Sequence, residues 1–148
     1  DKGKMIVQTD APTQHPEVSS KMDQRWVMPP TGWTKLNVGG SYVHAKKAVG
    51  GGMVLRSDHG EIIFTACREI RTYDNSLHAE LAACREGLEL ALYWTEIPIA
   101  IEMDSTEAVK MIKATAVHRA KFHLLVEETK RMVTDDPREI SINAISRS

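Results

Sequence analysis

The hydrophobic pattern of this chain changes its period near residue 76, and this change limits the folds that the chain can adopt. Before it, β-branched and apolar residues gather in short runs that are separated by glycine-containing turns. From residue 77 to residue 94, leucine or cysteine instead recurs at every third or fourth position. The first pattern is typical of strands in hairpins, and the second is typical of one face of an amphipathic helix. Strands joined by short turns are antiparallel, whereas strands joined through helices are parallel, so both kinds are expected in one mixed sheet.

The predicted elements follow the order β-β-β-α-β-α-α-β. The predicted strands cover residues 35–42, 51–56, 61–68, 98–103 and 139–145, and the predicted helices cover residues 77–94, 105–115 and 122–133. A turn with the pattern Asp-x-Gly at Asp58 joins the second and third strands. We therefore predict an α/β fold with a mixed five-stranded sheet, in which three antiparallel strands precede parallel α-β units and helices flank the sheet.

The first 24 residues differ from the rest of the chain. They are polar, contain Pro12 and Pro16, and show no sustained hydrophobic period, which predicts a linker or tail. The remaining residues, 25–148, suit a single domain. The chain begins with Asp1 and not with methionine, which suggests a fragment of a longer protein.

Composition excludes some classes of protein and favours others. The net charge of -1 is not that of a protein that binds nucleic acid through bulk charge, although local basic patches remain compatible with it. Apolar runs are too short to span a bilayer and no leader segment opens the chain, so we expect no membrane partner. Cys67 and Cys84 lack metal-ligand spacing and fall on apolar faces. Buried, reduced thiols favour an intracellular location, either cytoplasmic or nuclear.

Glu80 is an acid on the apolar face of a predicted helix. It lies four residues before Cys84, so the two side chains share one face. Burial of a bare carboxylate is costly, and such a group must be paired, protonated or bound to a metal. The alternative is that Glu80 lies at the margin of this face and pairs with Arg68, Arg71 or Lys35. The position alone leaves both interpretations open.

Asp104 follows the apolar strand 98–103 and precedes a predicted helix. Its spacing to Glu107 fits a capping box, and an acid at a helix N-terminus suits the helix dipole. The carboxyl end of a parallel strand is also where α/β sheets place catalytic groups and ligands. Both roles can coexist.

Several motifs in a fixed order resemble one family. They are Trp26 and the stretches 29–41 (PPTGWTKLNVGGS), 50–56 (GGGMVLR), 79–88 (AELAACREGL) and 102–105 (EMDS). In this order and spacing they resemble the plant reverse-transcriptase-like ribonuclease H domains, which are found in retroelement polyproteins or as separate proteins. The resemblance covers nearly all of residues 26–148.

The resemblance implies a two-metal site, with Mg²⁺ or Mn²⁺, that cleaves the RNA strand of an RNA–DNA hybrid. Glu80 corresponds to the family's helix glutamate, and Asp104 corresponds to the aspartate at the end of the fourth strand, so both would be catalytic metal ligands. The family's first aspartate, in the pattern Asn-x-Asp-Gly-Ser, falls on Gly39. Its last acid lies on a C-terminal helix, at a position beyond Ser148. These two departures predict an inactive or weakly active ribonuclease H.

Basic residues form the candidate nucleic-acid surface. They are Lys46, Lys47, Lys110, Lys113, Arg119 and Lys121. The resemblance implies that such residues meet the phosphates of an A-form-like hybrid, which proteins recognise mainly by shape, phosphates and 2′-hydroxyls. The alternative is an ordinary solvated surface. The competing function for the whole domain is a non-enzymatic module that binds a protein or a nucleic acid.

Overall fold

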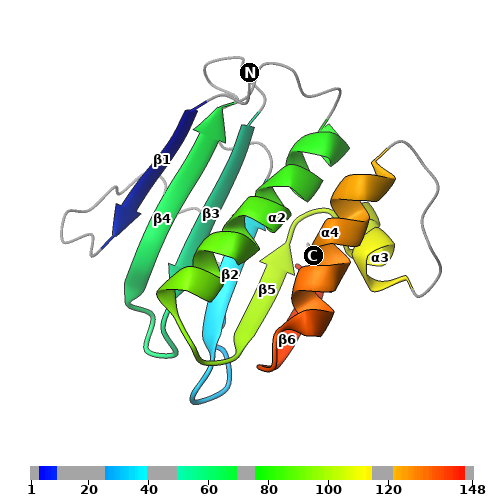
Figure 1. The fold of residues 1–148 in the computed structure, drawn as a ribbon. Helices are drawn as coiled ribbons and strands as arrows, with labels where there is room; N and C mark the ends of the chain where they lie inside the picture. Colours follow the sequence, from blue (N-terminus) through cyan, green and yellow to red (C-terminus); the bar gives the residue numbers. More distant parts are fainter. Residues whose placement is uncertain (1–3, 10–25, 40–49, 70–75, 115–121, 146–148) are drawn as a thin grey trace.

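A computed structural model describes residues 4–9, 26–39, 50–69, 76–114 and 122–145 (Figure 1). The elements in chain order are β1 (Lys4–Thr9), β2 (Thr34–Gly39), β3 (Gly50–Arg56), β4 (Ile62–Glu69), α2 (Ser76–Trp94), β5 (Ile99–Met103), α3 (Thr106–Lys113), α4 (His123–Asp135) and β6 (Ile140–Ala144). From β2 onward this is the predicted order. No helix in these ranges is long and apolar enough to span a membrane.

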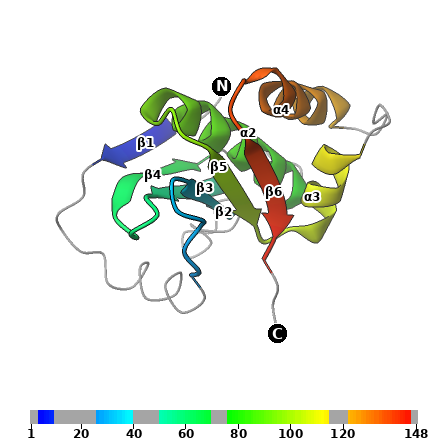
Figure 2. The ribbon, with the colours of Figure 1, turned by 90° about the horizontal axis from the view of Figure 1, so that it is seen from below.

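The strands form a single mixed sheet in the order β1-β4-β3-β2-β5-β6. The four strands from β1 to β2 pair in antiparallel fashion, whereas β5 is parallel to both β2 and β6. The helices gather on one face of this sheet (Figures 1 and 2). The predicted α/β architecture, with antiparallel strands followed by parallel α-β units, is therefore confirmed.

Strand β1 corrects the expectation of a tail for part of the N-terminal segment. Residues 4–9 pair with β4, with Ile6 opposite Cys67, and they extend the expected five-stranded sheet to six strands. The run Met5-Ile6-Val7 is too short to establish a period, so its sequence pattern is ambiguous. The open N–H and C=O groups of β4 provide hydrogen-bond partners that no local pattern encodes. Residues 10–24 lie outside the described residues.

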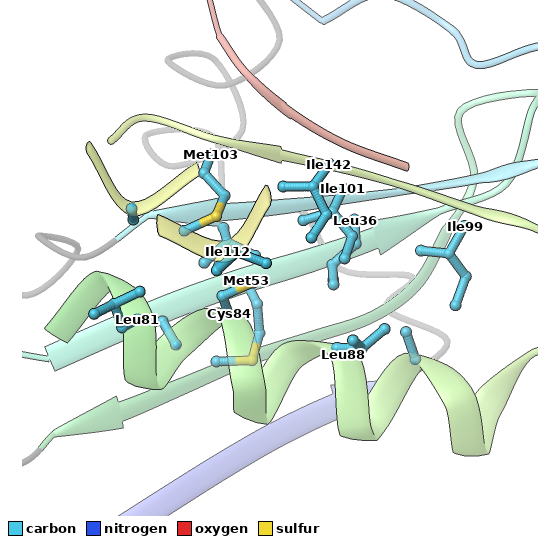
Figure 3. Close-up of a cluster of buried hydrophobic side chains, with 14 of the residues drawn as sticks. Leu36, Met53, Leu81, Cys84, Leu88, Ile99, Ile101, Met103, Ile112 and Ile142 are labelled. Atoms are coloured by element: carbon cyan, nitrogen blue, oxygen red, sulfur yellow. The ribbon is translucent and has the colours of Figure 1, made fainter. Parts of the chain in front are cut away.

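The core lies between the sheet and the helices, and α2 supplies much of it. Figure 3 shows the labelled side chains of α2 facing those of the strands: Leu81, Cys84 and Leu88 on the helix and Leu36, Met53, Ile99 and Ile101 on the sheet. All seven are almost fully buried. The leucine period of the sequence therefore marks the face of α2 that packs on the sheet.

A glycine sets how closely α2 approaches the sheet. A Cβ atom at Gly87 would lie 3.2 Å from Met53 Sδ and 3.4 Å from Leu36 Cδ2. The helix backbone therefore packs directly on the middle of β2 and β3. Because α2 runs in the direction opposite to β2 (Figure 1), its first turns lie at the carboxyl ends of β2 and β5.

Candidate active site

Gly39 and Asp104 lie side by side at the carboxyl ends of two parallel strands. The last register pair of β2 and β5 is Val38 opposite Met103, and Gly39 and Asp104 are the next residues of the two strands. A Cβ atom at Gly39 would lie 3.7 Å from Asp104 Oδ2, with no other described atom within 4 Å. Gly39 is also not among the described glycines with positive φ. The backbone at residue 39 therefore accepts a side chain, and an aspartate there would face Asp104.

Glu80 lies at the same end of the sheet. Gly87 packs at the level of Leu36. The seven residues of helix from Gly87 back to Glu80 and the three residues of strand from Leu36 to Gly39 each span about 10 Å. Because the helix and the strand run in opposite directions, Glu80 stands at about the level of Gly39. The structure thus brings the three residues that the family motif selects to one end of the fold.

Glu80 is buried, with 8% of its surface exposed. Burial raises the pKa of the Cys84 thiol to about 12, and the charge of Glu80 adds to this effect. Of the basic partners considered for Glu80, Lys35 instead pairs with Glu102, at 2.9 Å between Nζ and Oε2. The side chains of Arg68 and Arg71 lie outside the described residues.

The capping role expected of Asp104 belongs to its neighbour. Ser105 is the N-cap of α3, and its Oγ accepts a hydrogen bond of 3.0 Å from the backbone N–H of Ala108. The helix begins at Thr106, so only a side chain at position 105 is placed to reach the third N–H of the helix. The capping-box expectation for Asp104 is therefore wrong, because the N-cap is Ser105.

The donor set does not fit a two-metal centre. Two Mg²⁺ ions need several carboxylate oxygens in a rigid arrangement. Among the described residues, no group of three or more His, Cys, Asp or Glu side chains is placed to hold a metal ion. Asp58 cannot supply the missing group, because it lies at the opposite end of β2, where it accepts a hydrogen bond of 2.8 Å from the Gly32 N–H. Asp74 lies outside the described residues.

A polar cluster beside the site was not identified from the sequence. Glu102 stands opposite Asn37 in the β2–β5 register, accepts a hydrogen bond of 3.3 Å from Asn37 Nδ2, and pairs with Lys35. Lys35 Nζ also donates to the backbone carbonyl of Val27 and lies 5.5 Å from the centre of the Trp26 ring. The sequence signal that could have indicated this cluster is the alternation of polar residues with Leu36 and Val38 along β2. These contacts join β2 to β5 directly below Gly39 and Asp104.

Only part of the predicted nucleic-acid surface can be described. Lys110 and Lys113 are exposed on α3. The remaining candidates, Lys46, Lys47, Arg119 and Lys121, lie outside the described residues. Their placement relative to the site therefore stays a prediction.

The chain belongs to the family of reverse transcriptase-like domains, whose profile matches residues 37–148. No protein with a curated description matches the chain in sequence. The family assignment agrees with the mixed sheet and with the order of the motifs.

Solved structures share this fold at low sequence identity. RNase H1 from the archaeon Halobacterium salinarum NRC-1 is 21% identical, with a TM-score of 0.64 over 78% of this chain and 87% of that chain. LC11-RNase H1, in complex with an RNA/DNA hybrid, is 12% identical, with a TM-score of 0.54 over 77% of this chain and 86% of that chain. The source of LC11-RNase H1 is compost, sampled by metagenomics. The foamy viral protease-reverse transcriptase, also in complex with an RNA/DNA hybrid, is 14% identical, with a TM-score of 0.65 over 94% of this chain but only 20% of that chain. These likenesses establish a ribonuclease H-like fold.

Proposed function

We propose that this chain is a ribonuclease H-like domain that binds RNA–DNA hybrids and cleaves them weakly or not at all. The observation that carries the proposal is the contact geometry of Gly39, whose Cβ direction meets Asp104 Oδ2 at 3.7 Å. In the family that the chain resembles, an aspartate occupies this position, and its carboxylate would supply oxygen ligands to the metal ions. A hydrogen atom stands there in this chain.

Glycine at position 39, in place of the family's aspartate, is expected to weaken metal binding far more than it weakens folding. Hard divalent cations bind through charged oxygens, and glycine offers no side-chain ligand. The glycine itself costs little, because it is the last residue of β2, where it pairs with Gly52 of β3, and does not lie in the strand interior. A protein with Gly39 can therefore retain the fold while metal affinity falls.

Hybrid binding is supported by the fold and by the exposed basic residues. Two of the related structures contain an RNA/DNA hybrid. Lys110 and Lys113 are exposed on α3, which begins two residues after Asp104. Phosphate contacts from such residues release counterions, so binding should weaken as salt concentration rises.

The cleavage test uses a labelled RNA–DNA hybrid with Mg²⁺ or Mn²⁺. We expect no cleavage at ordinary enzyme concentrations by the protein with Gly39. Robust metal-dependent cleavage that is lost in Glu80→Gln would overturn the proposed impairment. The Glu80→Gln variant also separates cleavage by this protein from cleavage by a contaminating nuclease.

The binding test compares hybrid, duplex DNA and single strands at several salt concentrations. A salt-sensitive preference for hybrid supports retained nucleic-acid binding. The absence of binding to all of these ligands would instead favour the alternative function, a non-enzymatic module with a protein partner.

A further inference from the structure

Strand β6 is the last strand on one side of the sheet that the described residues form. Within the described residues it pairs only with β5. The Ile99 N–H donates to the Glu139 carbonyl at 3.1 Å, and the Ile145 N–H donates to the Met103 carbonyl at 2.8 Å. Alternate residues of a strand direct both backbone groups to the same side. Residues 139, 141, 143 and 145 therefore face β5, whereas the N–H and C=O groups of residues 140, 142 and 144 point outward.

A groove runs beside this edge. It is a cavity of about 750 Å³ between β6, the end of α3 and α4. Ile112 of α3 and Ile142 of β6 line it, and both are buried, with 5% of their surface exposed. Figure 2 shows β6 with α3 and α4 beside it. The groove thus lies next to a row of outward backbone groups.

The charges of the groove favour an acidic occupant. Its basic residues are Lys113, Lys130 and Arg131, and its acidic residues are Glu127 and Asp135. Lys130 Nζ and Glu127 Oε2 lie 3.2 Å apart and neutralise each other. Lys113 and Arg131 are exposed, and three basic side chains stand against two acidic ones among the lining residues. The groove therefore has a local excess of positive charge in a chain whose net charge is -1.

We propose that an extended, acidic segment of a partner protein binds along β6 and adds a strand to the sheet. Its backbone would pair with the outward groups of Ile140, Ile142 and Ala144, and alternate side chains would enter the groove. A nucleic acid fits this edge poorly, because phosphates and the outward C=O groups are all hydrogen-bond acceptors. The repeat of donors and acceptors along β6 matches that of another peptide strand. The groove shares Lys113 with the proposed nucleic-acid surface, but pairing of a strand along β6 does not require cleavage at Gly39 and Asp104.

Amide hydrogen exchange tests the strand pairing directly. The probe is a labelled peptide that alternates valine with glutamate, and the control peptide alternates valine with lysine. With the acidic probe, the amides of Ile142 and Ala144 should exchange more slowly, whereas those of Ser141 and Asn143 should change little because they already face β5. Unchanged exchange at Ile142 and Ala144, at probe concentrations that saturate binding, would refute strand addition.

A matched pair of lysine variants tests the groove. Lys113 lines the groove, whereas Lys110 is exposed one turn earlier on the same helix and is not among the lining residues. We expect Lys113→Glu to weaken binding of the acidic probe about threefold to tenfold and Lys110→Glu to leave it nearly unchanged. Equal losses in the two variants would indicate general attraction to α3, as expected for a phosphate backbone, and would overturn the proposal.

A proline variant tests the edge without removing the β5–β6 hydrogen bonds. The N–H of Ala144 points outward, so Ala144→Pro removes one edge donor and blocks the approach of a strand. It should abolish probe binding while the melting temperature stays close to that of the parent. Unimpaired binding in this variant would refute the proposal. Protection of Ile142 and Ala144 that grows with protein concentration, in the absence of probe, would assign the edge to a second copy of this chain and overturn the peptide assignment.

Discussion

Restoring a carboxylate at position 39 is the sharpest test of the site geometry. In Gly39→Asp, the new side chain begins 3.7 Å from Asp104 Oδ2, so two carboxylates come together. Two unit charges about 4 Å apart repel by about 1 kcal/mol in water and about 4 kcal/mol near a protein surface. Both positions are partly exposed, which favours the lower part of this range. Loss of glycine flexibility in the unfolded chain offsets about 0.5 kcal/mol or more of the repulsion.

The matched control is Gly39→Asn, which has nearly the same shape but no charge. Both variants restrict the unfolded chain to a similar extent, but only the aspartate is repelled by Asp104. Gly39→Asn should therefore be more stable than Gly39→Asp by about 1–2 kcal/mol. The free energy of unfolding is measured by urea denaturation at neutral pH and low salt. Asp104→Asn in the Gly39→Asp background should recover most of the lost stability.

Added Mg²⁺ distinguishes a rebuilt cation site from simple repulsion. A divalent cation between two carboxylates binds only the folded state, so the melting temperature of Gly39→Asp should rise with Mg²⁺ concentration. The melting temperatures of Gly39→Asn and of the parent should respond much less. Equal stability of the aspartate and asparagine variants, with no Mg²⁺ response in either, would show that residue 39 does not face Asp104 and would refute the reasoning.

Three further predictions concern titration and the polar cluster. Because burial raises the pKa of Cys84 from 9.0 to about 12, the unfolded thiol ionises first, and stability should fall as pH rises above 9.0; a Cys84→Ala variant should show a shallower decline. The Gly32 N–H lowers the pKa of Asp58 below 3.8, so this carboxylate contributes stability that is lost as pH falls through its folded pKa, and acid titration of Asp58→Asn should lack this component. Glu102→Gln should destabilise the fold by about 1–3 kcal/mol because it leaves the buried Lys35 ammonium without its carboxylate. In a double-mutant cycle with Lys35→Met the two losses should not add, and simple additivity would show that the pair does not interact.

Local patterns carried much of the prediction of the site. Glu80, Asp104 and Gly39 were selected by motif spacing, and the fold brings them to one end of the sheet. The spacing could not distinguish Asp104 from Ser105 as the helix cap, because that choice depends on a one-residue difference in where α3 begins. The position of Asp58 in a hairpin turn already argued against it as a substitute ligand, and its contact with Gly32 agrees with that interpretation.

Sequence by itself determined the order of the elements from β2 onward, the face of α2 that packs on the sheet, and the absence of a first-strand aspartate. These properties depend on hydrophobic period and on residue identity, which are local. Tertiary structure decided the pairing of β1 with β4, the Lys35–Glu102 ion pair and the groove beside β6. Each joins residues that are distant in the chain, and no local period specifies which strand edge or which charge a segment will meet. Both the sequence and the tertiary structure contribute to the nearness of Gly39 to Asp104. The motif identified the two residues, and the parallel pairing of β2 with β5 brings them together, so that a Cβ atom at Gly39 would lie 3.7 Å from Asp104 Oδ2.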